Sequence, residues 1–148
     1  MTVQRFILLL CLLPMFCCSV DVHGADEPLA GRLEQARERF SAGAYPEAAA
    51  LFFQLFQQYP ANSEVNFYLG RSAFESGDYE TAVMAYERVL LADPGVTQAK
   101  LEMAKSFYRL GARPTAVRLF RELADSDLPA EVRAQIKAFL ATTDAEPQ

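Results

Sequence analysis

The pattern of apolar and polar positions divides the chain into a short apolar leader and a longer segment with a regular repeat. Residues 6–16 read FILLLCLLPMF; they follow a short head with one cation and precede a more polar segment that ends at Gly24. This three-part order predicts a secretory signal peptide at residues 1–24. The apolar run is too short to cross a bilayer, because a spanning helix needs about 20 apolar residues.

Two other fates of the leader stay open. A head with a single cation is a weak signal, so an uncleaved N-terminal anchor is the first alternative. The second is lipidation of Cys17 or Cys18, although neither follows the small residue that usually precedes a lipidated cysteine.

The longer segment repeats every 34 residues. Equivalent places hold glycines, alanines, aromatic residues and prolines: Gly43, Gly77 and Gly111; Ala48, Ala82 and Ala116; Phe52, Tyr86 and Phe120; Pro60 and Pro94. Glycine allows the positive φ of a tight turn between two helices, and proline ends the second helix of a pair. Small residues are expected to face one another where the helices cross: Ala36 and Ala48, Gly70 and Ala82, Ala104 and Ala116.

This pattern resembles the tetratricopeptide-repeat family, with the fullest match in residues 63–96. The matching pieces there are Leu69-Gly70, Gly77-Asp78-Tyr79, Ala82, Tyr86 and Asp93-Pro94. The resemblance implies an all-α fold, a right-handed superhelix of three helix-turn-helix units at residues 29–62, 63–96 and 97–130. Each unit leaves an apolar face that only a neighbouring unit can cover.

The two ends of the array differ from its middle. The first unit has polar Arg32, Gln35 and Arg39 at places that are mostly apolar in the second, which suits a unit without a predecessor. After the third unit, Val132, Ile136, Phe139 and Leu140 form one helical stripe. We therefore expect a capping helix at residues 129–141, a repeat domain at residues 25–141 and a flexible tail at residues 142–148.

Composition excludes several classes of function. A net charge of −5 gives no electrostatic support for nucleic-acid binding. Every cysteine and the single histidine lie in the predicted leader, so the remaining chain lacks the commonest ligands of zinc. No phosphate-binding loop, metalloprotease motif or serine-hydrolase motif occurs. We expect no enzyme, no cofactor and no metal; a carboxylate-based enzyme is the remote alternative.

The resemblance implies that the first helix of each unit lines a concave groove. Cations recur there at Arg37, Arg71 and Lys105, which we call the cation column. Apolar residues flank the column at helical spacing, which places them on the same face. The candidate peptide-binding groove comprises Leu33, Arg37, Phe40, Phe67, Tyr68, Arg71, Phe74, Leu101, Lys105, Tyr108 and Arg109.

The groove predicts a protein or peptide partner that offers acidic groups and apolar anchors. Two plainer readings stay open, since aromatic residues also serve packing and helical cations often form a solvated face. The clamp for a chaperone C-terminus, which some members of the family carry, is absent. Its places hold Leu33, Arg37, Tyr68, Gln98 and Glu102 in place of the lysines and asparagines.

We expect an exported scaffold, most consistent with a periplasmic location, that binds proteins or peptides in envelope assembly or export. Its contact with a membrane would come only through a partner or an uncleaved leader, and its oligomeric state is open. The alternative rests on a weaker resemblance to the N-terminal domain of surface lipoprotein assembly modifiers, carried by Pro129, Val132, Arg133, Ile136, Phe139 and Leu140. It implies a stand-alone partner of an outer-membrane barrel in lipoprotein delivery.

Overall fold

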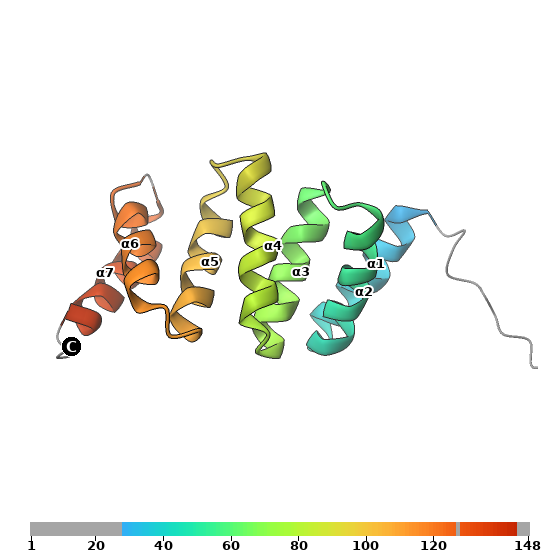
Figure 1. The fold of residues 1–148 in the computed structure, drawn as a ribbon, viewed down its shortest axis with the longest axis horizontal. Helices are drawn as coiled ribbons and strands as arrows, with labels where there is room; N and C mark the ends of the chain where they lie inside the picture. The colour runs from blue at the N-terminus through green and yellow to red at the C-terminus, as the bar shows by residue number, and fades with distance from the viewer. Residues whose placement is uncertain (1–27, 127, 145–148) are drawn as a thin grey trace, which may run out of the picture.

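A computed structural model describes residues 28–126 and 128–144, and this part of the chain is helical throughout, without a strand (Figure 1). The helices are α1 (Leu29–Ser41), α2 (Tyr45–Gln58), α3 (Ser63–Ser76), α4 (Tyr79–Ala92), α5 (Thr97–Arg109), α6 (Arg113–Ala124) and α7 (Ala130–Asp144). The expected all-α class and the three helix pairs are confirmed. The predicted signal peptide lies outside the described residues.

The turn inside each helix pair depends on a glycine. Gly43, Gly77 and Gly111 have φ angles of 75°, 84° and 78°, the left-handed region that other L-residues enter at a cost of roughly 1–2 kcal/mol. A side chain at these positions would meet no atom within 4 Å, so the backbone conformation, not space, requires glycine. The glycines spaced by 34 residues therefore mark the turns, as predicted.

Polar side chains fix the connection between the first and second pairs. The Asn62 side chain accepts a hydrogen bond from the backbone N–H of Val65 at 3.0 Å and so caps α3. Asn66 is buried, and its amide donates to the backbone carbonyls of Pro60 and Asn62 at 2.9 and 2.8 Å. These bonds hold α3 at a set angle to the end of α2.

The helices follow one another in a row from α1 to α7 (Figure 1), and the contacts between them show which way the row curves. Consecutive helices pack along the chain, and α3 also contacts both α1 and α5. The second helices α2, α4 and α6 make no such contacts with one another in the described part of the chain. An array whose odd-numbered helices touch while its even-numbered helices stay apart curves toward the odd-numbered side. The helices that carry the predicted groove residues, α1, α3 and α5, therefore lie on the concave side.

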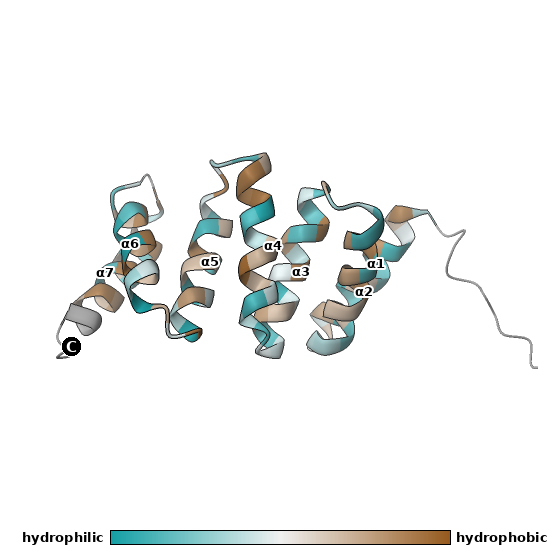
Figure 2. Cartoon of the chain, viewed as in Figure 1, coloured by the Kyte–Doolittle hydropathy of each residue, from teal (hydrophilic) through white to brown (hydrophobic). Residues whose placement is uncertain are grey.

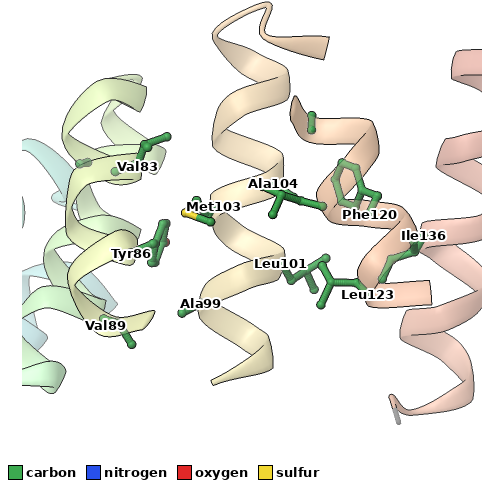
Figure 3. Close-up of a cluster of buried hydrophobic side chains, with 14 residues drawn as sticks. Val83, Tyr86, Val89, Ala99, Leu101, Met103, Ala104, Phe120, Leu123 and Ile136 are labelled. Atoms are coloured by element: carbon green, nitrogen blue, oxygen red, sulfur yellow. The ribbon is translucent and has the colours of Figure 1, made fainter. Parts of the chain in front are cut away.

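Two clusters of buried side chains form the core. The first fills the space among α1, α2 and α3 and includes Phe52, Leu55 and Leu69. The second runs from α3 to α7 around Tyr86 and Leu123 (Figure 3). The C-terminal end of α4 is apolar (Figure 2), and one of its residues, Leu91, is 82% exposed. Each cluster includes residues from neighbouring helix pairs, so every pair buries its apolar face against the next.

Helix α7 packs on α6, as the apolar stripe predicts. Ile136 is 2% exposed, and the Phe139 ring lies 4.7 Å from that of Tyr108 and 4.5 Å from that of Phe120 between centroids. The helix continues to Asp144, past the expected end at residue 141. Neither glycine nor proline occurs between residues 130 and 144 to end it, so the expected tail at residues 142–148 begins as helix.

The middle pair differs from the outer two in one tight contact. A Cβ placed on Gly70 would lie 2.7 Å from a ring carbon of Tyr86, which is too close for any real side chain. The first and third pairs instead combine Ala36 with Phe52 and Ala104 with Phe120. Gly70 and Tyr86 are therefore matched to each other, because the tyrosine ring, whose side chain is longer by a hydroxyl group, lies against a helix surface that has no Cβ.

We expect Gly70→Ala to lower the free energy of unfolding, because overpacking costs about 1–3 kcal/mol and exceeds the helix propensity gained, about 0.5–1 kcal/mol. The double variant Gly70→Ala with Tyr86→Phe should recover most of this loss. It recreates the pairing of the outer units, in which a ring without a hydroxyl can shift away from the methyl group. Urea denaturation measures both; a double variant as unstable as the single one would contradict the matched pair.

Candidate functional site

Aromatic rings fill the N-terminal half of the groove by packing on one another. Tyr68 on α3 stacks on Phe52 at 5.4 Å between centroids, with an interplanar angle of 12°. The rings of Phe40 and Phe67 meet the same tyrosine edge-on at 5.9 and 6.1 Å. Leu33 is buried at 7% exposure. These predicted groove residues therefore serve mainly to join the first two helix pairs.

The cation column is largely paired within the chain. Arg37 forms ion pairs with Glu34 at 3.4 Å and with Glu64. Lys105 forms an ion pair with Glu102 at 3.0 Å. The Arg71 guanidinium instead lies over the Phe40 ring at 4.6 Å, and no ion pair of Arg71 occurs within the described residues. The column therefore offers less free positive charge than its sequence suggests, with Arg71 the cation that is not neutralised by a carboxylate.

The C-terminal half of the groove contains an open cavity of about 340 Å³, which we call the apolar cavity. It lies among α3, α5, α6 and α7, and most of its walls are aliphatic and aromatic. Its lining comprises Phe74, Leu101, Lys105, Tyr108, Arg109, Phe120, Val132, Gln135, Ile136 and Phe139. A volume of this size falls at the lower end of the range found for ligand-binding sites.

The structure brings together five of the predicted groove residues in this cavity: Phe74, Leu101, Lys105, Tyr108 and Arg109. The other half of its wall comes from residues that sequence reasoning assigned to packing. Val132, Ile136 and Phe139 were expected only to cover the third repeat, and they do so while also facing the cavity. The sequence carries no signal for this second role, because an apolar stripe has the same spacing whether or not part of it lines a cavity.

A smaller cavity of about 150 Å³ adjoins the first and shares Phe74 and Lys105 with it. We call it the polar cavity, because charged groups dominate its walls. Its lining comprises Arg71, Phe74, Glu75, Tyr86, Glu102 and Lys105. Burial raises the pKa of the Tyr86 hydroxyl far above its usual value, and the carboxylate of Glu102 raises it further. The hydroxyl therefore stays protonated.

Residues 28–126 and 128–144 hold no cluster of three or more histidine, cysteine, aspartate or glutamate side chains that would suit a metal ion. Over the same residues, the helices are all too short or too polar to span a membrane.

Comparison with known proteins decides the family. A family model described as the tetratricopeptide repeat matches residues 33–97, the part that contains α1 to α4. The chain is a tetratricopeptide-repeat (TPR) protein. The glycines, alanines and aromatic residues spaced by 34 thus correspond to successive TPR units. No curated protein matches the chain significantly in sequence.

Solved TPR structures share the fold. SycD, the type III secretion translocator chaperone of Yersinia enterocolitica, superposes with a TM-score of 0.71 at 18% identity, over 78% of this chain and 83% of SycD. PcrH, solved with the chaperone-binding region of PopD, gives 0.68 at 24% identity, over 79% and 91%. The first TPR domain of Spaghetti (RPAP3), bound to an HSP90 peptide, gives 0.62 at 15% identity, over 76% and 92%. At these identities the similarity establishes the fold of this TPR protein.

We expect Ile136→Ala to destabilise the docking of α7 by about 2–5 kcal/mol, since it removes a buried side chain and leaves a void. Amide hydrogen exchange should accelerate in α7 and at the apolar cavity, with α1 and α2 unchanged, because repeats stabilise mainly their neighbours. Lys137→Ala, at an exposed position on the same helix, is the control. Acceleration spread evenly over all helices would contradict this local role.

Proposed function

We propose that this TPR protein is a binding scaffold that holds a peptide segment of a partner protein in its concave groove, with an apolar side chain of the segment in the apolar cavity. The observation that carries the proposal is the cavity itself, open on the concave face and lined mainly by apolar side chains. Burying one leucine- or phenylalanine-sized side chain contributes about 1.5–3 kcal/mol, which makes it a suitable anchor. The chemistry proposed is binding, not catalysis.

The structural neighbours support a peptide as the partner. PcrH was solved with the chaperone-binding region of PopD, SycD with a peptide of the translocator YopD, and the RPAP3 domain with an HSP90 peptide. A TPR array presents a preformed concave surface, so an extended or helical segment can bind without refolding the scaffold. We propose the same mode of binding for the present chain, but not the same partners.

An acidic group in the partner is a second element of the proposal, and it rests on Arg71. Arg37 and Lys105 already pair with glutamates, so binding an acidic group at either would first have to break an internal ion pair. The Arg71 guanidinium lies over the Phe40 ring, and the residue is exposed. An acidic side chain on another residue of the segment, bound on the α1 side where the guanidinium lies, would reach Arg71 with the least rearrangement.

We further propose that the protein acts outside the cytoplasm, in envelope assembly or export. The support is the three-part apolar leader at residues 1–24, which has the order of a signal peptide. The delivery of surface lipoproteins with a separate barrel is the narrower version. Its support is the Pro-x-x-Val-Arg-x-x-Ile-x-x-Phe-Leu pattern at residues 129–140, the segment that supplies one wall of the apolar cavity.

The first experiment is photo-crosslinking in cells with a benzoylphenylalanine probe at Gln135, an exposed residue that lines the cavity. The same probe at Lys137, exposed on the same helix but outside the cavity, is the positional control. We expect one dominant partner adduct at position 135 and none at 137, with mass spectrometry locating the crosslink in the partner.

A substitution in the cavity wall makes this experiment decisive. Val132→Lys places an ammonium group against the apolar lining, whereas Ala134→Lys adds the same side chain at an exposed position on α7. The adduct at position 135 should fall at least about tenfold with Val132→Lys, as expected from loss of one buried anchor, and persist with Ala134→Lys. An adduct indifferent to both substitutions would place the binding surface elsewhere.

The acidic element has its own test once the crosslinked segment is available as a synthetic peptide. Arg71→Gln should weaken its binding about three- to tenfold at low salt, and the difference should shrink at high salt. Arg118→Gln, on the exposed side of α6, should leave affinity unchanged. Isothermal titration calorimetry measures both; equal affinities at every salt concentration would remove the acidic element and leave the apolar anchor.

A further inference from the structure

The polar cavity contains a buried hydroxyl group without a hydrogen-bond partner. Tyr86 is 0% exposed, and no group of the described residues accepts or donates a hydrogen bond at its hydroxyl oxygen. Burying a hydroxyl in this way destabilises a protein unless something satisfies it. The oxygen belongs to a side chain that lines the polar cavity, so whatever enters the cavity is the group that can satisfy it.

The other two repeats show that packing does not require this hydroxyl. The equivalent residues Phe52 and Phe120 are phenylalanines, and they are as buried, at 0% and 3% exposure. In the middle repeat alone, the phenol comes with a glycine, Gly70, against the ring. The structure therefore accommodates an oxygen that the fold does not need. Of the three equivalent aromatic residues, Tyr86 is the one that lines the polar cavity.

The charges around the hydroxyl indicate which kind of group fits. Two cations, Arg71 and Lys105, and two carboxylates, Glu75 and Glu102, line the cavity, so its walls have no formal net charge. One oxygen of Glu102 already accepts from Lys105 at 3.0 Å and from Gln98 at 2.8 Å. A neutral group that accepts from the phenol and donates to a carboxylate suits these walls better than an ion, and a peptide amide has both capacities.

The position of the cavity relates that amide to the proposed anchor. The polar and apolar cavities share Phe74 and Lys105. A peptide whose apolar side chain occupies the apolar cavity would therefore have its main chain next to the polar cavity. Arg71 and Glu75, which also line the polar cavity, are exposed. Rotamer changes of such side chains are common on binding and would open the path to the phenol.

We propose that the Tyr86 hydroxyl donates a hydrogen bond to a main-chain carbonyl of the bound peptide, next to the apolar residue that occupies the apolar cavity. This inference rests on the proposed function and adds to it a hydrogen bond that recognises the peptide main chain. The partner is thus a peptide whose apolar residue occupies the apolar cavity while the adjacent main-chain carbonyl accepts a hydrogen bond from Tyr86. An extended segment suits this arrangement better than a helix, because the carbonyls of a helix are already hydrogen-bonded.

The test uses N-acetyl-L-leucinamide, which carries one apolar side chain between two amide groups, and the purified full-length chain. Nuclear magnetic resonance titration gives the affinity and maps the site through the amide signals of Phe74, Leu101 and Phe139. We expect Tyr86→Phe to weaken binding about fivefold, the typical value of one neutral hydrogen bond. Tyr59→Phe, which removes a hydroxyl at a surface position outside both cavities, should change nothing.

Stability measured in parallel distinguishes recognition from a structural role. The thermal midpoint of the free Tyr86→Phe protein should equal or exceed that of the unaltered protein, because the substitution removes an unsatisfied buried oxygen. A lower midpoint together with weaker binding would overturn the inference, since the hydroxyl would then serve the fold. Equal affinity of the two proteins would overturn it while leaving the proposed apolar anchor intact.

A second probe tests the choice of a neutral group. N-acetyl-L-leucine replaces the C-terminal amide with a carboxylate and otherwise keeps the same side chain. We expect it to bind no better than the amide. Tighter binding of the carboxylate that is lost in Tyr86→Phe would overturn the main-chain assignment in favour of an acidic group. Binding of neither probe at the mapped signals, even at millimolar concentration, would overturn this inference and the proposed apolar anchor together.

Discussion

The fit between an aromatic ring on the second helix of each pair and a small residue on the first is the contact on which the array depends. It sets how closely two helices approach, and the shared core then carries that spacing from pair to pair. In the middle pair, the fit is tight enough that glycine is the one residue that leaves room for Tyr86. The same side chain forms part of the core and part of a cavity wall, so packing and the proposed recognition involve one position.

The repetition in the sequence predicted most of the fold because it records backbone requirements that are local. A left-handed turn needs glycine, a helix ends before proline, and both signals recur at fixed spacing. The end of α7 was harder to predict, since nothing in residues 130–144 forbids a helix and nothing marks its end. Local signals therefore located turns better than they located the last residue of the chain's final helix.

The candidate site was predictable in its location and not in its shape. The recurrence of an aromatic residue at Phe74 and Tyr108, and of a cation at Arg71 and Lys105, identified the face, because helical spacing decides which residues share it. Whether such residues stay accessible depends on what neighbouring helices press against them. Phe40 and Tyr68 lie in contact with rings of the first two helix pairs, whereas Tyr108 contacts the Phe139 ring and also lines the apolar cavity. The pairing of Lys105 with Glu102 follows an i,i+3 spacing that the sequence shows, whereas the pairing of Arg37 with Glu64 joins two helices and needed the structure.

The position of α7 at the end of the array has a thermodynamic consequence. In a stack stabilised by nearest neighbours, the terminal helix has one flank, and it frays more readily than any helix between two others. Because α7 supplies Val132, Ile136 and Phe139 to the apolar cavity, the cavity exists only in molecules whose last helix is docked. A ligand there binds the docked form alone, so its apparent affinity is reduced by the frayed fraction and its binding suppresses the fraying in return. The stability of the docked α7 and the apparent affinity of the apolar cavity for a ligand therefore depend on the same docking equilibrium.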